Sequence, residues 1–95
     1  MIRETSRAAF SSIIGELPIR RAQVLNAINK LGKCTNQQIA AYMELEINFI
    51  TPRVGELERS GLVITKQTTL NHRGRVCRVW ELSESAKQQL KNNEL

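Results

Sequence analysis

The stretch from Glu46 to Leu62 constrains the chain most, because a proline and a glycine fix where a helix inside it begins and ends. Pro52 lacks an amide hydrogen, so it is tolerated only in the first helical turn. Gly61 takes a left-handed cap conformation without steric cost, so the helix ends there. We expect Asn48 or Thr51 to cap its start, since either side chain can accept a bond from a free amide.

This predicted helix is amphipathic. Its apolar positions recur at intervals of three, four and three residues, which defines one helical face: Ile47, Ile50, Val54 and Leu57. The opposite face is polar and carries Asn48, Thr51, Arg53, Glu56 and Arg59. Taken alone, the pattern is more typical of an ordinary surface helix, so its role depends on the segments around it.

The preceding residues predict two further helices. The first covers residues 19–31 and ends at Gly32, with an apolar stripe of Ala22, Val24, Leu25, Ile28 and Leu31. The second begins with the sequence T-N-Q-Q, a capping box in which Thr35 is the cap and Gln38 reaches back to it. This helix runs to about Met43, and a turn in which Leu45 points inward leads to the next. Residues 35–60 therefore form a helix-turn-helix within a helical core of residues 19–60.

After Gly61 the periodicity changes to alternation, which predicts a β-hairpin over residues 62–82. The turn lies in the sequence N-H-R-G, and the return strand runs from Arg75 to Leu82. Trp80 and Leu82 share the face that packs on the helices. Ser83 then caps a closing helix that ends near residue 92. A hairpin that directly follows a helix-turn-helix is a wing.

An additional helix is predicted at the N-terminus, over residues 1–17, with Thr5 or Ser6 as its cap. Its apolar stripe consists of Ala9, Phe10, Ile13, Ile14 and Leu17. The stripe either packs within the monomer or forms a homodimer contact. The predicted fold class is mainly α with a small antiparallel hairpin (α+β), a winged helix-turn-helix in one domain of residues 1–95.

Composition favours an anionic partner. The net charge is +5, and the segment from Ile47 to Trp80 carries six Lys/Arg against two Glu. The two cysteines, Cys34 and Cys77, and the single His72 are too few and too scattered for a metal site. We found no apolar run of about 20 residues and no signal-peptide core, which predicts a cytoplasmic protein without a membrane partner.

The order of these segments resembles the MarR-type winged-helix DNA-binding domains over residues 19–85. The sequence L-E-R-S-G-L-V, starting at Leu57, is similar to the junction between recognition helix and wing in that family. The sequences I-N-F-I-T-P-R-V-G-E-L and G-R-V-C-R-V-W are similar to short winged-helix proteins of phages and prophages. The resemblance implies that the N-terminal end of the helix after Glu46 enters the DNA major groove.

The chain also departs from that family. Full-length MarR regulators have long terminal helices that form a dimer and a ligand pocket, whereas this chain continues only about ten residues past its wing. We therefore expect no small-molecule effector and no cofactor, and leave a homodimer through the N-terminal helix as an open expectation.

Arg53 is the leading candidate for base recognition, because its guanidinium fork matches guanine O6 and N7. The alternative is a surface ion pair with Glu56. Asn48 is suited to adenine, and Thr51 to a base or a phosphate, but both compete with a capping role. Phe49 contacts a thymine methyl group or joins the core.

The other candidates face the DNA backbone. Phosphate or minor-groove contacts are expected from the wing, at Lys66, His72, Arg73, Arg75 and Arg78, and from the start of the second core helix, at Thr35, Asn36 and Gln37. The alternative for the wing is a solvated hairpin whose charges prevent strand pairing with other molecules. The link around Cys34 is expected beside the return strand, which leaves a thiol pair with Cys77 open, although packing roles are favoured.

These observations predict a sequence-specific protein that binds double-stranded DNA, a transcriptional regulator without enzymatic activity. The alternative is a protein-interaction module that uses the Phe10, Ile13 and Ile14 stripe. Double-stranded DNA is favoured over RNA, because few aromatic residues are available for base stacking.

Overall fold

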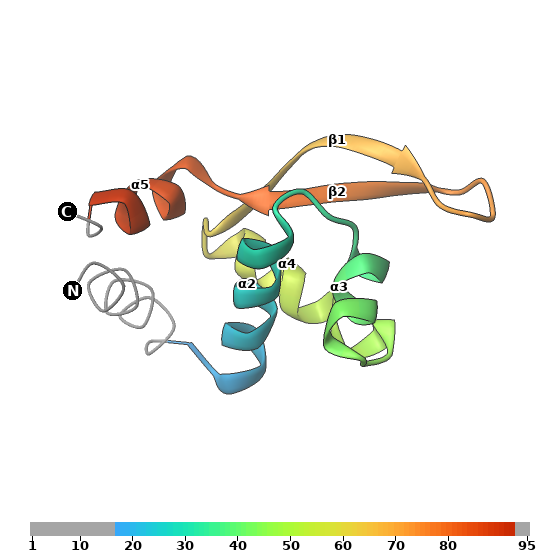
Figure 1. The fold of residues 1–95 in the computed structure, drawn as a ribbon, viewed down its shortest axis with the longest axis horizontal. Coiled ribbons are helices and arrows are strands. Elements are labelled where there is room, and N and C mark those ends of the chain that lie inside the picture. Colours follow the sequence, from blue (N-terminus) through green and yellow to red (C-terminus); the bar gives the residue numbers. More distant parts are fainter. Residues whose placement is uncertain (1–16, 93–95) are drawn as a thin grey trace.

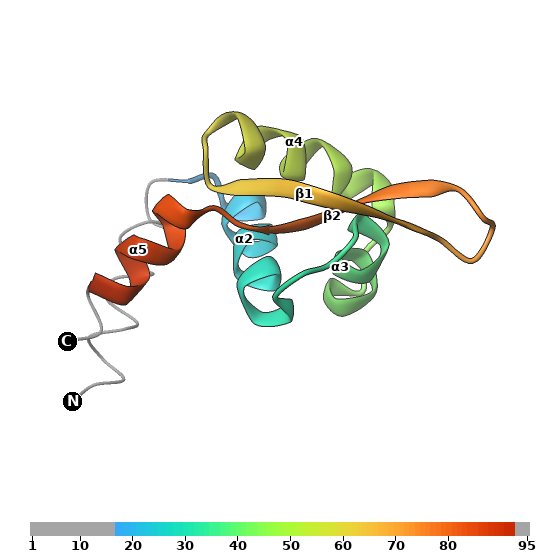
Figure 2. The same ribbon diagram turned by 90° about the horizontal axis from the view of Figure 1, so that it is seen from above.

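A computed structural model describes residues 17–92. Three helices form the body, a hairpin follows, and a last helix closes the chain: α2 (Ile19–Leu31), α3 (Asn36–Met43), the 3₁₀ turn η1 (Ile47–Phe49), α4 (Thr51–Arg59), β1 (Val63–Leu70), β2 (Val76–Leu82) and α5 (Glu84–Asn92). The hairpin lies over one side of the helical body (Figure 1), and in the view from that side its line separates α4 from α2 and α3 (Figure 2). The α+β class and the winged helix-turn-helix order are confirmed. The helix predicted over residues 1–17 falls almost wholly outside the described residues, and so does the dimer contact assigned to it.

Helix α2 has the predicted bounds and packs against α3, α4 and β2. Its buried residues are Ala22, Val24, Leu25, Ala27 and Ile28. The predicted burial of Leu31 is wrong, because its side chain is 37% exposed at the last turn of the helix. Gly32 follows with a φ of 80° and donates to Ile28 O. The helix therefore ends directly after Leu31, at a position where this side chain does not reach the core. The described part of the chain contains no helix long and apolar enough to span a membrane.

Helix α3 begins with the predicted capping box. Gln38 N donates to Thr35 Oγ1 at 3.2 Å, and Thr35 N donates to Gln38 Oε1 at 2.9 Å. The helix ends at Met43, and the next residue, Glu44, has a φ of 57° in the left-handed region. Leu45 N then donates to Ala40 O at 3.0 Å, and Leu45 packs partly buried against the core, as predicted. The tight turn at Glu44 and Leu45 connects α3 through η1 to α4.

Helix α4 begins at Thr51, so Pro52 lies in its first turn as predicted. The predicted cap is wrong: Ile50 occupies the cap position, and no side chain bonds the free amides there. A buried Ile50 leaves the cap position without a polar side chain. The predicted burial of Ile47 is also wrong, because η1 interrupts the helical spacing and leaves this side chain 43% exposed. Ile50, Val54 and Leu57 are buried as expected.

The end of α4 is a Schellman motif. Gly61 has a φ of 78° and donates to Glu58 O, while Leu62 N donates to Leu57 O, both at 3.0 Å. These bonds satisfy carbonyls that the helix end leaves free. The motif turns the chain directly into β1, and Val63 at the start of that strand is fully buried.

The two strands pair antiparallel, from Val63 opposite Leu82 to Leu70 opposite Val76. A bulge at Lys66 shifts the register between Thr65 and Gln67. A bulge bends the strand and increases its twist. Beyond it, β1 is exposed throughout, and the hairpin extends past α3 (Figure 1).

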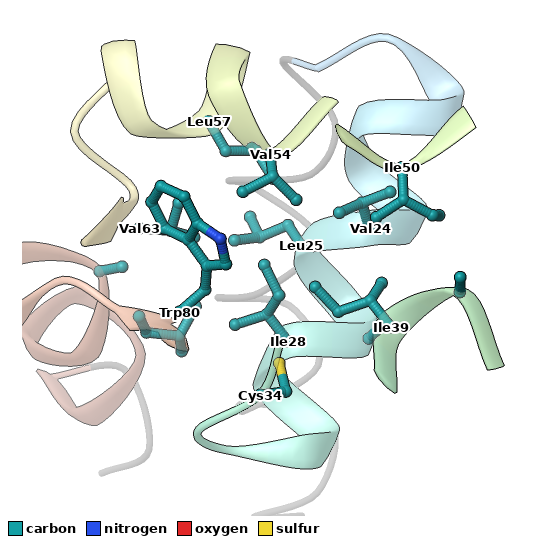
Figure 3. Close-up of a cluster of buried hydrophobic side chains, with 14 residues drawn as sticks. Val24, Leu25, Ile28, Cys34, Ile39, Ile50, Val54, Leu57, Val63 and Trp80 are labelled. Atoms are coloured by element: carbon teal, nitrogen blue, oxygen red, sulfur yellow. The ribbon is translucent and has the colours of Figure 1, made fainter. Parts of the chain in front are cut away.

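The inner half of β2 is buried on both faces, from Val79 to Leu82, rather than on the predicted Trp80 and Leu82 face alone. Trp80 enters the core beside Leu25 and Val54 (Figure 3). Glu81 on the other face is 6% exposed, and its Oε1 lies 3.5 Å from Lys87 Nζ of α5.

Helix α5 has the predicted Ser83 cap. Ala86 N donates to Ser83 Oγ at 3.1 Å, and Ala86 joins the core cluster. The ion pair between Lys87 and Glu81 adds a second link to the hairpin. Helix α5 therefore continues from β2 at the end of the hairpin opposite its turn (Figure 2).

Candidate nucleic-acid interface

The start of α3, the side of α4 and the wing enclose a cleft of about 450 Å³. The structure brings six predicted site residues to its walls: Thr35, Asn36, Gln37, Thr51, Arg75 and Arg78. The lining also includes residues that the sequence did not single out as site residues: Ile47, Val54, Gly55, Glu58, Asn71, Val76, Cys77 and Trp80. The remaining candidates, at Asn48, Phe49, Arg53, Lys66, His72 and Arg73, do not line the cleft.

The start of α3 offers backbone donors to this cleft. The capping box uses the N–H groups of Thr35 and Gln38. The N–H groups of Asn36 and Gln37 belong to the first turn, where no intrahelical acceptor exists. They suit an anionic group, because the positive end of the helix dipole adds to their effect.

A short chain of hydrogen bonds joins α3 to the start of α4. Asn36 Nδ2 donates to Thr51 Oγ1 at 3.3 Å, and Thr51 Oγ1 donates to Ile47 O at 3.2 Å. Thr51 therefore bonds a carbonyl of η1 instead of capping α4. The Oδ1 atom of Asn36 is buried in the cleft wall without a hydrogen-bond partner in the described chain. This network holds the two helices of the helix-turn-helix in a fixed relation.

Asn48 and Phe49 are exposed on η1, and Arg53 is half-buried in the first turn of α4. Phe49 is 52% exposed, so it does not belong to the core. Arg53 forms the ion pair that the sequence left as an alternative: its Nε lies 2.7 Å from Glu56 Oε1. Arg21, from α2, shares the same carboxylate at 3.2 Å.

The wing turn is held by one side chain. Asn71 Oδ1 accepts from the N–H groups of Arg73 at 2.9 Å and Arg75 at 3.0 Å. Gly74, with a φ of 77°, completes a three-residue loop in which Asn71 N donates to Arg75 O. The sequence identifies Asn71 as a typical turn residue. That its side chain accepts two hydrogen bonds, from Arg73 N–H and Arg75 N–H, is visible only in the folded turn.

The wing carries exposed basic side chains, and its cations are Lys66, Arg73, Arg75 and Arg78. His72, Arg73, Arg75 and Arg78 are exposed, and Lys66 lies exposed at the bulge. Within residues 17–92, the salt bridges involve Arg21, Arg53 and Lys87 and none of these wing cations. The outer wing therefore carries positive charge that is not neutralised by the described chain.

The two cysteines lie on opposite sides of a strand pairing. Cys34 N donates to Trp80 O at 3.0 Å, and Trp80 N donates to Cys34 O at 2.7 Å, so the link pairs with β2 as predicted. Cys77 lies three residues before Trp80 on β2, so the two Cα atoms of Cys77 and Trp80 are roughly 10 Å apart along the strand. A disulfide requires Cα atoms within about 7 Å. Both thiols are free, and burial raises the pKa of the Cys34 thiol to about 11.

Comparison with known proteins identifies the fold. The chain matches no family model and no curated protein sequence. Among solved structures, it is similar to Bacillus subtilis PadR in complex with operator DNA, with a TM-score of 0.63, 19% identity, and coverage of 79% of this chain and 46% of PadR. It is also similar to NMB1585, a MarR family regulator from Neisseria meningitidis, with a TM-score of 0.62, 22% identity, and coverage of 84% of this chain and 56% of that one.

A third similar structure is a mutant of Escherichia coli MarR complexed with operator DNA, with a TM-score of 0.62 and 13% identity. The match covers 97% of this chain and 65% of MarR. The chain thus spans about half to two thirds of the length of these regulators. Nothing in these comparisons bears on the resemblance to phage proteins, which stays a prediction. The chain has a MarR-like winged helix-turn-helix fold.

Proposed function

We propose that this protein binds double-stranded DNA sequence-specifically and regulates transcription. The observation that carries the proposal is the placement of three elements around one cleft: the α3 N-terminus with its free N–H groups, one side of α4, and the cationic wing. Two structurally similar proteins, PadR and MarR, were solved with operator DNA, which supports the proposal. The start of α4 would enter the major groove, and the wing would contact the flanking backbone or minor groove.

In this proposal the candidate residues divide into base contacts and backbone contacts. Arg53, Asn48 and Phe49 would face base edges at the start of α4. The first turn of α3, with Asn36 and Gln37, would bind phosphate through its N–H groups. The wing cations would add the salt-dependent part of the affinity through phosphate contacts.

The proposal includes further expectations. A homodimer would place two recognition helices on half-sites about one helical turn apart. The protein would act in the cytoplasm, where DNA is accessible and thiols are reduced. It requires no effector, cofactor, metal or membrane, and no catalytic activity.

The test is selection from random duplex DNA at two salt concentrations, followed by affinity measurement on the selected site. We expect Arg53→Ala to relax the choice of one base pair by about 10-fold or more, because a bidentate contact contributes about 1–3 kcal/mol of discrimination. We expect Arg73→Ala to weaken binding evenly across sequences and to reduce the salt slope by about 1.

Arg20→Ala is the matched control, since it removes the same charge from an exposed position on α2, outside the cleft lining. If the parent protein enriches no sequence and its binding disappears at high salt, the proposal of a sequence-specific regulator is wrong. If Arg53→Ala discriminates bases as the parent does, the role of Arg53 is wrong.

A further inference from the structure

Glu56 lies at the centre of a three-residue ion cluster that joins two helices. Arg53 Nε is 2.7 Å from Glu56 Oε1, and Arg53 Nη2 donates to Glu56 Oε2 at 3.1 Å. Arg21 Nε donates to Glu56 Oε1 at 3.2 Å across 35 residues of sequence. The side chains of Arg21 and Glu56 are each 25% exposed, and that of Arg53 is 35% exposed.

This geometry engages only one edge of the Arg53 guanidinium. The Nε and Nη2 edge lies toward the carboxylate, but only Nη2 donates a hydrogen bond to it; Nε is within ion-pair distance, is shielded from solvent and has no hydrogen-bond partner in the described chain. A guanidinium has five N–H donors in a rigid plane. The second edge, formed by Nη1 and the other N–H of Nη2, is not used by Glu56. Two parallel donors on that edge are what bidentate binding of guanine O6 and N7 requires.

The cluster also restrains the direction in which this edge points. An intrahelical pair on a solvated helix is weak, because two long side chains must both be immobilised. Here the carboxylate is also held from a second helix, since Arg21 lies on α2 and α2 packs against α4. Arg53 is therefore less free to rotate than an exposed arginine on a single helix.

Electrostatics makes this arrangement costly for non-specific binding. A carboxylate on a DNA-facing helix repels phosphates, so Glu56 lowers affinity for any duplex. An isolated cation at position 53 would bind DNA more tightly but would sample many orientations. A carboxylate that lowers overall affinity while orienting a base-reading group raises the ratio of specific to non-specific binding.

We propose that Glu56 is a specificity-determining positioning residue: it orients the Arg53 guanidinium for bidentate recognition of a base edge, and Arg21 fixes Glu56 from α2. This inference rests on the proposed function. The inference adds that the ion pair between Arg53 and Glu56 is retained when DNA binds. The Arg53 guanidinium would then contact a carboxylate on one edge and a base on the other.

The experiment compares Glu56→Gln and Glu56→Ala with the parent on the selected site, on a duplex with the Arg53-dependent base pair replaced, and on random duplex. For both variants we expect affinity for random duplex to rise and discrimination at that base pair to fall by about 10-fold. Glu56→Asp retains the charge and is expected to recover part of the discrimination. Thermal unfolding checks that each variant is folded.

A double-mutant cycle with Arg53→Ala separates positioning from a structural role. If Glu56 acts through Arg53, Glu56→Ala causes no additional loss of discrimination when position 53 is already alanine. Arg21→Ala is expected to reduce discrimination at the same base pair although Arg21 itself contacts no base. Glu84→Ala, a charge-matched control at an exposed position on α5 outside the cleft lining, is expected to leave discrimination at that base pair unchanged.

The outcomes are distinguishable. A parent protein that selects no DNA sequence overturns the proposed function, and this inference with it. A parent that selects a sequence, together with a Glu56→Gln variant that keeps the parental discrimination, overturns the inference alone. Equal loss of discrimination from Glu56→Ala with and without Arg53 also overturns it, because Glu56 would then act independently.

Discussion

The chemical behaviour of the Cys34 thiol is determined by its burial in the core. Its backbone bonds twice to Trp80, and its side chain is 2% exposed within the core. Burial disfavours the charged thiolate, which raises the pKa of the thiol from 9.0 to about 11. The residue therefore acts as a small apolar group, while the half-buried Cys77 on the wing is the more accessible thiol.

We predict that Cys34 contributes an alkaline decline in stability. Between about pH 9 and pH 11 the unfolded state binds fewer protons at this thiol than the folded state, so the free energy of unfolding falls as pH rises. The slope is at most about 1.4 kcal/mol per pH unit. Urea unfolding at pH 8, 9 and 10 measures it, with Cys34→Ala as the control that lacks this contribution. Equal slopes in both proteins would show that the thiol pKa is not raised.

At the scale of residues, local signals were predictable and distant ones were not. The Thr35 capping box and the Gly61 cap were correctly predicted, because each depends on residues within about one helical turn. The ion pair between Glu56 and Arg53 was an alternative that the sequence offered for the same reason, and the structure contains it. Arg21 could not be assigned to that pair, because its partner lies 35 residues away and is brought near by helix packing.

Helix α4 contains an element-scale feature that folding does not explain. Gly55 lies in the middle of the helix, where glycine is less stable than alanine by about 0.5–1 kcal/mol. A methyl group there would meet only Arg59 Nη1, at an ordinary contact distance of 3.6 Å. The glycine is therefore not required by packing in the described chain, but it lies on the cleft wall.

We predict that Gly55→Ala stabilises the protein by about 0.5–1 kcal/mol and weakens its binding to DNA severalfold. Stability rises because alanine favours the helix, and affinity falls because the methyl group projects where the duplex would approach α4. Denaturant unfolding and duplex affinity measure the two effects. Asn29→Ala, on α2 outside the cleft, is the control for helix propensity alone. Unchanged affinity in Gly55→Ala would mean that DNA does not approach this part of α4.

Element boundaries were predicted well where a glycine or proline marks them. Helix α2, which lies between Pro18 and Gly32, has the predicted bounds, and α3 also ends at the predicted Met43, where no glycine or proline follows. The errors at Leu31 and Ile47 share one cause: periodicity was extended to residues at which the helix ends or is interrupted. A hydrophobic repeat gives a face only while the helical spacing continues.

At the scale of the whole molecule, one core joins elements from both halves of the chain. Leu25 and Ile28 on α2, Val54 on α4, and Trp80 on the hairpin contribute to the same cluster (Figure 3). The sequence predicted the individual apolar faces, but the burial of both faces of inner β2 depends on how the hairpin crosses the helices. The way in which the hairpin crosses the helices cannot be predicted from the alternation of residues along a single strand.

We predict that two leucines of α2 differ sharply in their contribution to stability. Leu25→Ala is expected to lower the free energy of unfolding by about 2–5 kcal/mol, because Leu25 is 1% exposed and its loss leaves a cavity. Leu31→Ala is expected to cost less than about 1 kcal/mol, since this side chain is 37% exposed. Urea unfolding of both variants tests the pair. Equal losses would contradict the packing of α2 described above.

The division of the wing into a buried inner half and an exposed outer half has a consequence for how such a molecule can vary. Beyond the bulge at Lys66, β1 contributes no buried side chain, and β2 contributes none before Val79. Substitutions in the outer wing therefore alter the charge and shape offered to a partner while every core contact remains. The residues of the wing tip can therefore be exchanged, in an engineered variant, without redesigning the helices on which the inner half of the hairpin packs.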